Sequence, residues 1–477
     1  MVRTLWLVVA VSISLESAAA ERPNLVLILV DDLDLNLGST DFMPNLHRLL
    51  VQQGLTFSDF FVTNSLCCPS RATILRSQYT HSHEIVASEA PAGGFEKFLQ
   101  LGHESSTLAT WLDAAGYRTL LLGKYLNGYP LRGDRTHRPP GWHEWLSPAD
   151  GTPYRGYDYW LNENGRLVFY GSSASDYLTD VLARKAEGLL SRDVSKPFFL
   201  LLAPYAPHYP APPAPRHRNL FRDARVPRTP SFNEADVSDK PAPRNVLSGG
   251  DIEEIDELYR SRLRSLQAVD EMIARLFRVL ESSGRLGNTY VFFTSDNGFH
   301  MGQHRLRPQK ATHYEEDIRV PFIVKGPGVA TGGVVAGYLA GNVDLAPTLA
   351  ELAGIDVPHF VEGRSLVPFL RGDPPPPTSW RQAFLLEQYS DEGLIAPSTG
   401  MSRPIFVGLR TLRYKYVEYW TGVRELYDLG SDPYELENLG DRAPRELVTE
   451  LSTVLRDLAR CSGAGCRAAE VVFVPGR

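Results

Sequence analysis

The sequence predicts an α/β fold: a large, mixed but mainly parallel sheet sandwiched by helices. Three apolar runs carry this prediction, at residues 24–30, 197–202 and 290–294, and each ends at polar or Pro-containing residues. Continuous apolar runs are typical of strands buried on both faces, as in parallel sheets. Amphipathic segments separate the runs, so strands and helices alternate along the chain. Of the 477 residues, 43% are hydrophobic and 22% charged, which is a globular composition.

The same periodicities predict the other elements of the main domain. They are helices at 45–53, 106–115 and 251–283 and a strand at 117–122. Residues 203–250 are rich in Pro, Arg, Asn and Asp, and this segment is long enough to be a functional loop. We interpret five of its arginines as a solvated surface, with a cationic lip for anionic substrates as the alternative. These arginines are Arg216, Arg218, Arg222, Arg225 and Arg228.

A run of four prolines at 374–377 predicts a boundary between two domains. We place the main domain at residues 21–373 and a smaller C-terminal subdomain at residues 378–477. The short apolar segments beyond the prolines predict an α+β subdomain with an antiparallel sheet. Its predicted elements are strands at 383–387, 405–410 and 415–420 and a helix at 444–459.

The N-terminus predicts export. Residues 1–20 combine a basic start, a short apolar stretch and three alanines before Glu21, which is typical of a signal peptide. No later segment approaches the length of a membrane span. The net charge of −7 argues against nucleic acid as a partner. The chain contains no Asn-x-Ser/Thr sequon, which favours a secreted or periplasmic protein over a lysosomal one.

The four cysteines form two pairs with different expectations. Cys461 and Cys466 flank a flexible Ser-Gly-Ala-Gly segment, and we predict a disulfide between them, with two free surface thiols as the alternative. Cys67 and Cys68 are adjacent, so a disulfide between them would be strained. They need another explanation.

Polar residues follow two of the predicted strands. Asp31 and Asp32 end one strand, and Asp296 and Asn297 end another. Sites in parallel sheets form beyond the carboxyl ends of the strands. Adjacent carboxylates in a buried cleft repel each other unless a cation binds, and hard oxygen ligands suit Ca²⁺ or Mg²⁺ better than Zn²⁺. The alternative is that all four are turn and capping residues.

Cys67 lies beside a predicted helix N-terminus. Pro69 suits the first helical position, which places Cys68 at the cap. Free N–H groups and the helix dipole favour an anion there. The same environment would lower the pKa of a thiol, so a cysteine nucleophile remains an open alternative.

Taken together, these segments resemble the sulfatase family within the alkaline-phosphatase-like superfamily, over nearly the whole mature chain. The resemblance rests on ordered segments, namely Asp31-Asp32, Cys67-x-Pro69-Ser70-Arg71, Gly123-Lys124, Ala206-Pro207-His208, Ser295-Asp296-Asn297-Gly298, Lys310 with Tyr314-Glu315, and Leu426-Tyr427-Asp428-Leu429. In that family the cysteine of C-x-P-S-R is oxidised to formylglycine. The resemblance therefore implies a sulfatase with a catalytic main domain.

The resemblance also implies roles for individual residues. A formylglycine-generating enzyme would convert Cys67 into the nucleophile. Asp31, Asp32, Asp296 and Asn297, together with Cys67, would bind one Ca²⁺. The other catalytic residues would be Arg71, which steadies the nucleophile and the ion ligands, Lys124 and Lys310, which neutralise the sulfuryl group, and His208, which protonates the leaving oxygen or binds sulfate.

A narrower resemblance is to the glucosamine-6-sulfatases. It is carried by Leu66–Arg71, Gly123–Asn127, Pro140-Gly141-Trp142, Gly298–Gln303 and the terminal Cys461…Cys466 segment. It implies a 6-O-sulfated N-acetylglucosamine unit of a glycosaminoglycan-type glycan as the substrate. The chain lacks the long basic insertion of the endo-acting relatives, which favours exo action. We expect sugar contacts from Asn127 and His300.

Two departures from the family pattern matter. Leu126 stands where many sulfatases have a histidine that helps to regenerate the aldehyde. His81 and His83 are candidates for that role or for substrate binding, with ordinary surface histidines as the alternative. Arg76-Ser77-Gln78 replaces the usual Thr-Gly segment that assists the modifying enzyme.

Other functions remain compatible with the same residues. The same site suits another sulfated sugar, an aryl sulfate, or a phosphonate or phosphate ester. A glycan-binding homologue with unmodified Cys67 is the non-enzymatic alternative. A thiol hydrolase is less well supported, because a cysteine nucleophile does not explain four oxygen ligands.

Overall fold

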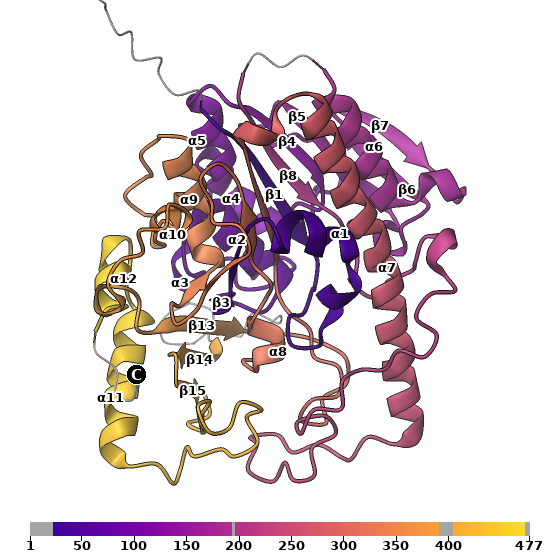
Figure 1. Ribbon diagram of the computed structural model, residues 1–477. Coiled ribbons are helices and arrows are strands. Elements are labelled where there is room, and N and C mark those ends of the chain that lie inside the picture. The colour runs from indigo at the N-terminus through magenta and orange to yellow at the C-terminus, as the bar shows by residue number, and fades with distance from the viewer. Residues whose placement is uncertain (1–21, 193–195, 391–403, 473–477) are drawn as a thin grey trace, which may run out of the picture.

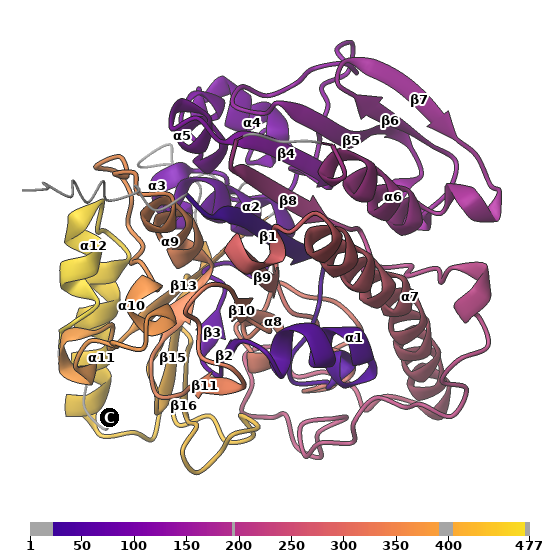
Figure 2. The same ribbon diagram turned by 45° about the horizontal axis from the view of Figure 1, so that its top comes forward.

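The computed structural model describes residues 22–192, 196–390 and 404–472, and the predicted leader lies outside them. A ten-stranded mixed sheet runs through the molecule, which confirms the predicted fold class (Figures 1 and 2). Its strands, in spatial order, are β11 (Gly333–Val335), β2 (Leu55–Phe57), β10 (Ile323–Lys325), β9 (Thr289–Ser295), β1 (Asn24–Val30), β8 (Phe198–Ala203), β4 (Arg118–Gly123), β5 (Glu144–Gly151), β6 (Tyr159–Glu163) and β7 (Arg166–Tyr170).

The centre of this sheet is parallel. β1 pairs in parallel with β8 on one side and β9 on the other, and β4 continues the parallel set. Every residue of β1 is buried, and its side chains alternate between two cores. Leu27 belongs to the core on one face and Ile28 to the core on the other. The continuous apolar pattern of the sequence follows from this two-sided burial.

Helices cover both faces of the sheet (Figures 1 and 2). One layer consists of α1 (Pro44–Leu46), α6 (Leu178–Leu190) and α7 (Gly249–Ser282). The other contains α2 (Cys67–Arg76), α3 (Thr80–His83), α4 (Gly94–Gln100), α5 (Leu108–Ala114), α9 (Leu345–Leu352) and α10 (Val367–Leu370). The short β3 (Phe60–Phe61) and β12 (Ala340–Gly341) pair separately, and α8 (Glu315–Ile318) lies near the site.

Helix boundaries depart from the predictions by a few residues. The predicted helix 45–53 is α1 followed by a π-helical turn at His47–Val51. The predicted helix 251–283 begins earlier, at Gly249. Ser248 caps it, since its hydroxyl accepts the Asp251 N–H at 3.2 Å while the Asp251 side chain returns to the Ser248 N–H at 2.9 Å. This capping box sets the start of the helix, and the acidic pattern alone did not reveal it.

The C-terminal region forms a separate antiparallel sheet, as predicted, but with four strands where three were expected. In spatial order these are β13 (Phe384–Tyr389), β14 (Pro404–Arg410), β15 (Tyr414–Tyr419) and β16 (Arg424–Asp428). Helices α11 (Arg445–Leu458) and α12 (Ala464–Ala469) complete the region, and the predicted Cys461–Cys466 disulfide is present. Leu385 and Leu451 belong to the same hydrophobic cluster as Leu27 of β1. The division at the four prolines therefore stays a prediction.

Several elements were not predicted from the sequence. β5 pairs in parallel with β4, β6 and β7 then extend the sheet by antiparallel pairing to its edge, and β16 closes the small sheet. Edge strands are exposed on one side, so they lack the continuous apolar pattern of β1. Within the described residues, no helix is both long and apolar enough to cross a membrane.

Candidate active site

The strand ends bring four predicted residues together. β1 and β9 are parallel and in register, so the residues that follow them leave the sheet side by side. The Asp32 N–H donates to Asp296 Oδ1 at 3.0 Å, and Asn297 Nδ2 donates to Asp32 Oδ1 at 2.8 Å. Asp31, Asp32, Asp296 and Asn297 are each at most 1% exposed. The sheet thus supplies a buried cluster of three carboxylates and one amide.

Helix α2 presents Cys67 to this cluster, but in a different register from the prediction. The helix begins at Cys67 with Leu66 as its N-cap, whereas we expected Cys68 at the cap and Pro69 in the first position. The Ser70 N–H donates to the Leu66 carbonyl at 3.1 Å and closes an earlier turn. Because N–H groups of the first turn have no intrahelical partner, proline fits the third position equally well.

The Cys67 thiol is surrounded by charged groups. Its Sγ lies 3.5 Å from Asp31 Oδ1 and 3.7 Å from Asp32 Oδ1, and Lys310 Nζ donates to it at 2.7 Å. Burial raises the pKa of the thiol and outweighs the opposite effects of Lys124 and Lys310. The expectation that the helix terminus lowers this pKa is therefore wrong. A thiolate nucleophile is disfavoured, which weakens the thiol-hydrolase alternative.

Three cations face the three carboxylates. Arg71 Nε donates to Asp296 Oδ2 at 2.8 Å, and Lys124 Nζ donates to Asp31 Oδ2 at 2.7 Å. Lys310 Nζ also donates to Asp32 Oδ1. These pairs offset charges whose isolated burial would be prohibitively unfavourable.

The ionisation of the carboxylates follows from these partners. Burial alone would raise the pKa of Asp31, but Lys124, His208 and Arg71 outweigh it and hold that pKa well below its usual range. The pKa of Asp296 is raised, because burial outweighs the effect of Arg71. The cluster therefore holds its negative charge more firmly at Asp31, beside Lys124, than at Asp296.

Close backbone packing positions Lys124. Gly123 has a φ of +113°, and a Cβ there would lie 2.0 Å from the Ala203 carbonyl oxygen. The Lys124 N–H donates to that same oxygen at 2.8 Å. The Lys124 ammonium lies 5.3 Å from the ring centroid of Tyr154 and 5.9 Å from that of Tyr205. Neither tyrosine was predicted, although Tyr205 lies three residues beyond the end of the predicted strand 197–202, and that position could have indicated it.

The cluster fits a divalent cation. Asn297 Oδ1 is buried and has no hydrogen-bond partner among the described residues, while its Nδ2 is engaged with Asp32. A buried unsatisfied acceptor is destabilising unless a ligand contacts it. Three carboxylates and this amide oxygen form a hard donor set of the kind that binds Ca²⁺.

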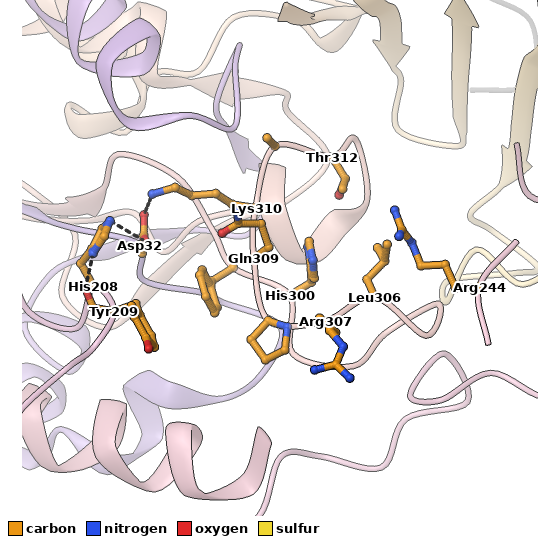
Figure 3. Close-up of a pocket in the computed structure, with 13 residues that line it drawn as sticks. Asp32, His208, Tyr209, Arg244, His300, Leu306, Arg307, Gln309, Lys310 and Thr312 are labelled. Carbon is orange, nitrogen blue, oxygen red and sulfur yellow. Dashed lines mark hydrogen bonds and ion pairs between the residues drawn. The ribbon is translucent and has the colours of Figure 1, made fainter. Parts of the chain in front are cut away.

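A cavity of about 670 Å³ opens onto the cluster from one side (Figure 3). His208 projects into it, 22% exposed, with Nε2 3.5 Å from Asp32 Oδ2. His300 also lines it and is held by Asp317, with Nδ1 2.9 Å from Oδ2. The lining includes Asp32, His208, Tyr209, Arg244, His300, Arg307, Gln309 and Lys310.

A second cavity of about 870 Å³ reaches Lys124 from the other side, and Tyr154 and Tyr205 line it. Asn127 and Leu126 belong to this lining. The two predicted sugar contacts, Asn127 and His300, therefore border different cavities. Leu126 offers no titratable group, as the sequence indicated.

His81 and His83 lie away from both cavities. His81 Nδ1 is 2.9 Å from Glu387 Oε1, and its Nε2 is 2.9 Å from the Cys461 carbonyl oxygen. His83 is fully buried, with Nε2 3.1 Å from Thr73 Oγ1. The structure does not bring these two histidines to the site.

Two of the five arginines interpreted above form ion pairs with carboxylates of α6 and α7. Arg216 pairs with Asp180 and Glu271, and Arg228 pairs with Asp256. None of the five arginines interpreted above lines either cavity beside the site, although Arg244 of the same loop lines the first one. The structure thus favours the solvated surface over the cationic lip.

Comparison with known sequences agrees with the site. The sequence profile of the family described as Sulfatase matches residues 23–355, and a profile described as N-sulphoglucosamine sulphohydrolase, C-terminal, matches residues 302–460. The chain is 34% identical to the N-acetylglucosamine-6-sulfatases of Homo sapiens and of Capra hircus, over 96% of its own length and 88% and 87% of theirs. It is 35% identical to an arylsulfatase of Volvox carteri over 94% of the chain and 76% of that protein.

Solved structures show the same fold. A protein in complex with its substrate D-glucosamine-2-N,6-O-disulfate matches with a TM-score of 0.74 and 25% identity, over 91% of this chain and 97% of that one. A phosphonate monoester hydrolase from Silicibacter pomeroyi matches in fold with a TM-score of 0.72 and 23% identity, over 92% of this chain and 94% of that one. The fold and site define an alkaline-phosphatase-like hydrolase. This chain belongs to the sulfatase family and is a sulfuric ester hydrolase.

Proposed function

We propose that the chain is an exported sulfatase that removes the 6-O-sulfate of N-acetylglucosamine units at glycan ends, with a formylglycine derived from Cys67 as its nucleophile. The observation that carries this proposal is the position of Cys67. Its Sγ lies 3.5 Å from Asp31 and 2.7 Å from Lys310, beside a cavity large enough for a sugar. The named relatives at 34% identity support the choice of sugar.

The Ca²⁺ would be held by Asp31, Asp32, Asp296 and Asn297, and the residue at position 67 would lie beside it. The bound ion would polarise the sulfate oxygens and so make the sulfur more electrophilic. Asn297 Oδ1, which lacks another partner among the described residues, supports this assignment.

Conversion of Cys67 by a formylglycine-generating enzyme would supply a hydrated aldehyde, whose hydroxyl attacks sulfur. Residue 67 sits in the first turn of α2, where free N–H groups and the helix dipole favour negative charge. Arg71, one turn further along, donates to Asp296 and to the Lys124 carbonyl oxygen. It would keep the helix and the carboxylates in a fixed relation.

Lys124 and Lys310 would neutralise the charge that develops on the transferring group. Both approach Cys67 from fixed positions, since each ammonium is anchored on a carboxylate. Preorganised charge of this kind needs no reorientation during the reaction. His208, partly exposed in the cavity, would donate a proton to the sugar oxygen as the sulfur–oxygen bond breaks.

Sugar recognition would come from the cavity walls. His300 is oriented by Asp317 in the first cavity, and Asn127 lines the second. The chain is acidic overall, with a net charge of −7, so its affinity for a sulfated glycan would depend on a few local cations. This supports exo action on a glycan end over binding along an extended polyanion.

Export would follow from the leader at residues 1–20. The Cys461–Cys466 disulfide supports an oxidising compartment, secreted or periplasmic. The partners would then be the modifying enzyme during maturation and the sulfated glycan afterwards. Lysosomal delivery is disfavoured, because the sequence has no glycosylation sequon.

Sulfate release from N-acetylglucosamine-6-sulfate with added Ca²⁺ tests this proposal. The protein is first shown by peptide mass spectrometry to carry converted Cys67, and a Cys67→Ala variant runs in parallel. We expect release by the converted protein and none by the variant. A parallel panel holds glucosamine-2-N,6-O-disulfate, an aryl sulfate and a phosphonate monoester.

The panel separates the alternatives. Turnover of only the aryl sulfate or phosphonate by fully converted protein would contradict the sugar assignment and keep the site chemistry. Cys67 that remains a thiol in a host with the modifying enzyme, with sugar binding intact, would support the silent glycan-binding homologue instead.

A further inference from the structure

A second buried polar cluster lies apart from the residues around Cys67. It consists of His304, Glu316 and Glu435, which are 3%, 6% and 1% exposed. One ligand atom from each residue lies within 4.8 Å of the others. The mechanism proposed above uses none of the three.

The cluster joins three segments that are distant in sequence. His304 lies in the loop that leads from β9 towards Lys310, Glu316 lies on α8, and Glu435 follows β16 in the C-terminal region. A ligand bound by these three residues would connect the loop that lines the first cavity with the C-terminal region.

Two atoms of this cluster are buried and unpaired. His304 Nε2 and Glu316 Oε2 have no hydrogen-bond partner among the described residues. A buried polar atom without a partner is destabilising unless a ligand contacts it. Both atoms belong to the same group of converging side chains, so one ligand bound between them would satisfy both.

The other nitrogen of His304 is already oriented. Its Nδ1 lies 2.7 Å from Glu234 Oε2, and the ring stacks on Tyr314 with centroids 3.9 Å apart. With the proton on Nδ1, Nε2 keeps its lone pair. A carboxylate behind the imidazole is the usual support of a histidine that binds a metal.

The local charges favour a cation. Glu316 and Glu435 place two carboxylates in one buried group. Lys415 Nζ lies 2.5 Å from Glu435 Oε1 but is shared with Glu315 Oε1 at 3.1 Å. Among the described residues, no lysine or arginine forms an ion pair with Glu316.

We propose that His304 Nε2, Glu316 Oε2 and a carboxylate oxygen of Glu435 bind a divalent transition-metal ion, for which Zn²⁺ is the probe. One imidazole nitrogen with two carboxylates is a donor set that suits Zn²⁺, unlike the all-oxygen set around Asp31. The ion ties the cavity loop and α8 to the C-terminal region. It is independent of the proposed sulfatase substrate.

Zinc content tests the proposal on the full-length protein. The protein is equilibrated with Zn²⁺ in excess Ca²⁺, desalted and analysed for metal, and its thermal unfolding is followed with and without Zn²⁺. We expect one Zn²⁺ per chain and a higher Tm with zinc. The isosteric Glu316→Gln variant should lose both. Ligands that bind only the native state raise its stability in this way.

Glu104→Gln provides the matched control. Glu104 is also 6% exposed and contacts a histidine, His137, but it lies outside the cluster. This variant should retain the zinc and the Tm shift. An Asp31→Asn variant should also retain zinc, which distinguishes this site from the calcium site. No bound zinc in the wild type, or equal zinc in Glu316→Gln, would overturn the proposal.

Absorption of the Co²⁺-substituted wild type gives a readout that needs no variant. Binding of one Co²⁺ per chain should produce visible absorption bands typical of low-symmetry coordination by nitrogen and oxygen. These bands should disappear when Zn²⁺ displaces the Co²⁺. Their absence would contradict a site formed by His304.

Discussion

The two buried polar clusters of this protein balance their charges differently. Around Cys67, Arg71, Lys124 and Lys310 face three carboxylates, and two cavities open onto the group. Around His304, Lys415 is the cation in ion-pair contact with Glu435, and Glu316 retains an unpaired atom within the described structure. The first arrangement is suited to neutralising a transferring anion, and the second to holding a cation that joins segments.

This contrast predicts that changes in the first cluster alter catalysis most. Lys124→Met should lower kcat for a sulfate ester by roughly 10²–10³, because the substitution removes preorganised charge from the transferring group. The measurement is kcat on protein whose Cys67 conversion has been confirmed by mass. Lys185→Met, which breaks only a surface pair with Glu163, should leave kcat unchanged. Equal kcat in wild type and Lys124→Met would remove Lys124 from the chemistry.

In the second cluster the expected effect is on stability. Lys415→Met leaves Glu435 buried without its cation, and we expect a loss of about 3–5 kcal/mol in the free energy of unfolding. Urea denaturation measures this loss, and added Zn²⁺ should recover part of it. Lys97→Met, at a half-buried lysine whose hydrogen bond goes to a backbone carbonyl, is the control and should lose less. A loss of stability as small as that of Lys97→Met would mean that the burial of Glu435 does not require its ion pair with Lys415.

His81 and Glu387 form a buried ion pair outside both clusters. We expect the loss of this pair to have the smallest effect on stability, and its pH dependence can be predicted. Burial would lower the pKa of His81, but Glu387 outweighs it and raises that pKa from 6.5 to about 9. Because the folded-state pKa is the higher one, the stabilisation is complete below pH 6.5 and is lost as the pH rises through about 9. The full contribution is about 3 kcal/mol.

The stability difference between wild type and His81→Asn should therefore shrink between about pH 6 and pH 10. His217→Asn is the control, because burial lowers the pKa of His217 and its contribution should stay constant above pH 7. A pH-independent difference for His81→Asn would show that the ring is neutral when folded.

The cluster of residues around Cys67 could be predicted from the sequence to a large extent. Asp31, Asp32, Asp296 and Asn297 each follow a buried strand, and parallel strands bring their carboxyl ends to one edge. The C-x-P-S-R segment then added Cys67 through its resemblance to a family. His81 and His83 show the limit of this approach. The sequence around them is typical of an accessible polar segment. In the structure, however, His81 contacts Glu387 and His83 contacts Thr73, away from the cavities beside Cys67.

The sequence by itself determined the α/β class, the central parallel strands, the C-terminal disulfide and the residues that gather around Cys67. These features depend on local apolar patterns, short spacings or strand ends. Only the tertiary structure decided that His304, Glu316 and Glu435 converge, and which nitrogen of His304 is left free. That cluster joins a loop, a short helix and a segment after β16, and no periodicity relates them. Its members become neighbours only when the two sheets pack into one hydrophobic core.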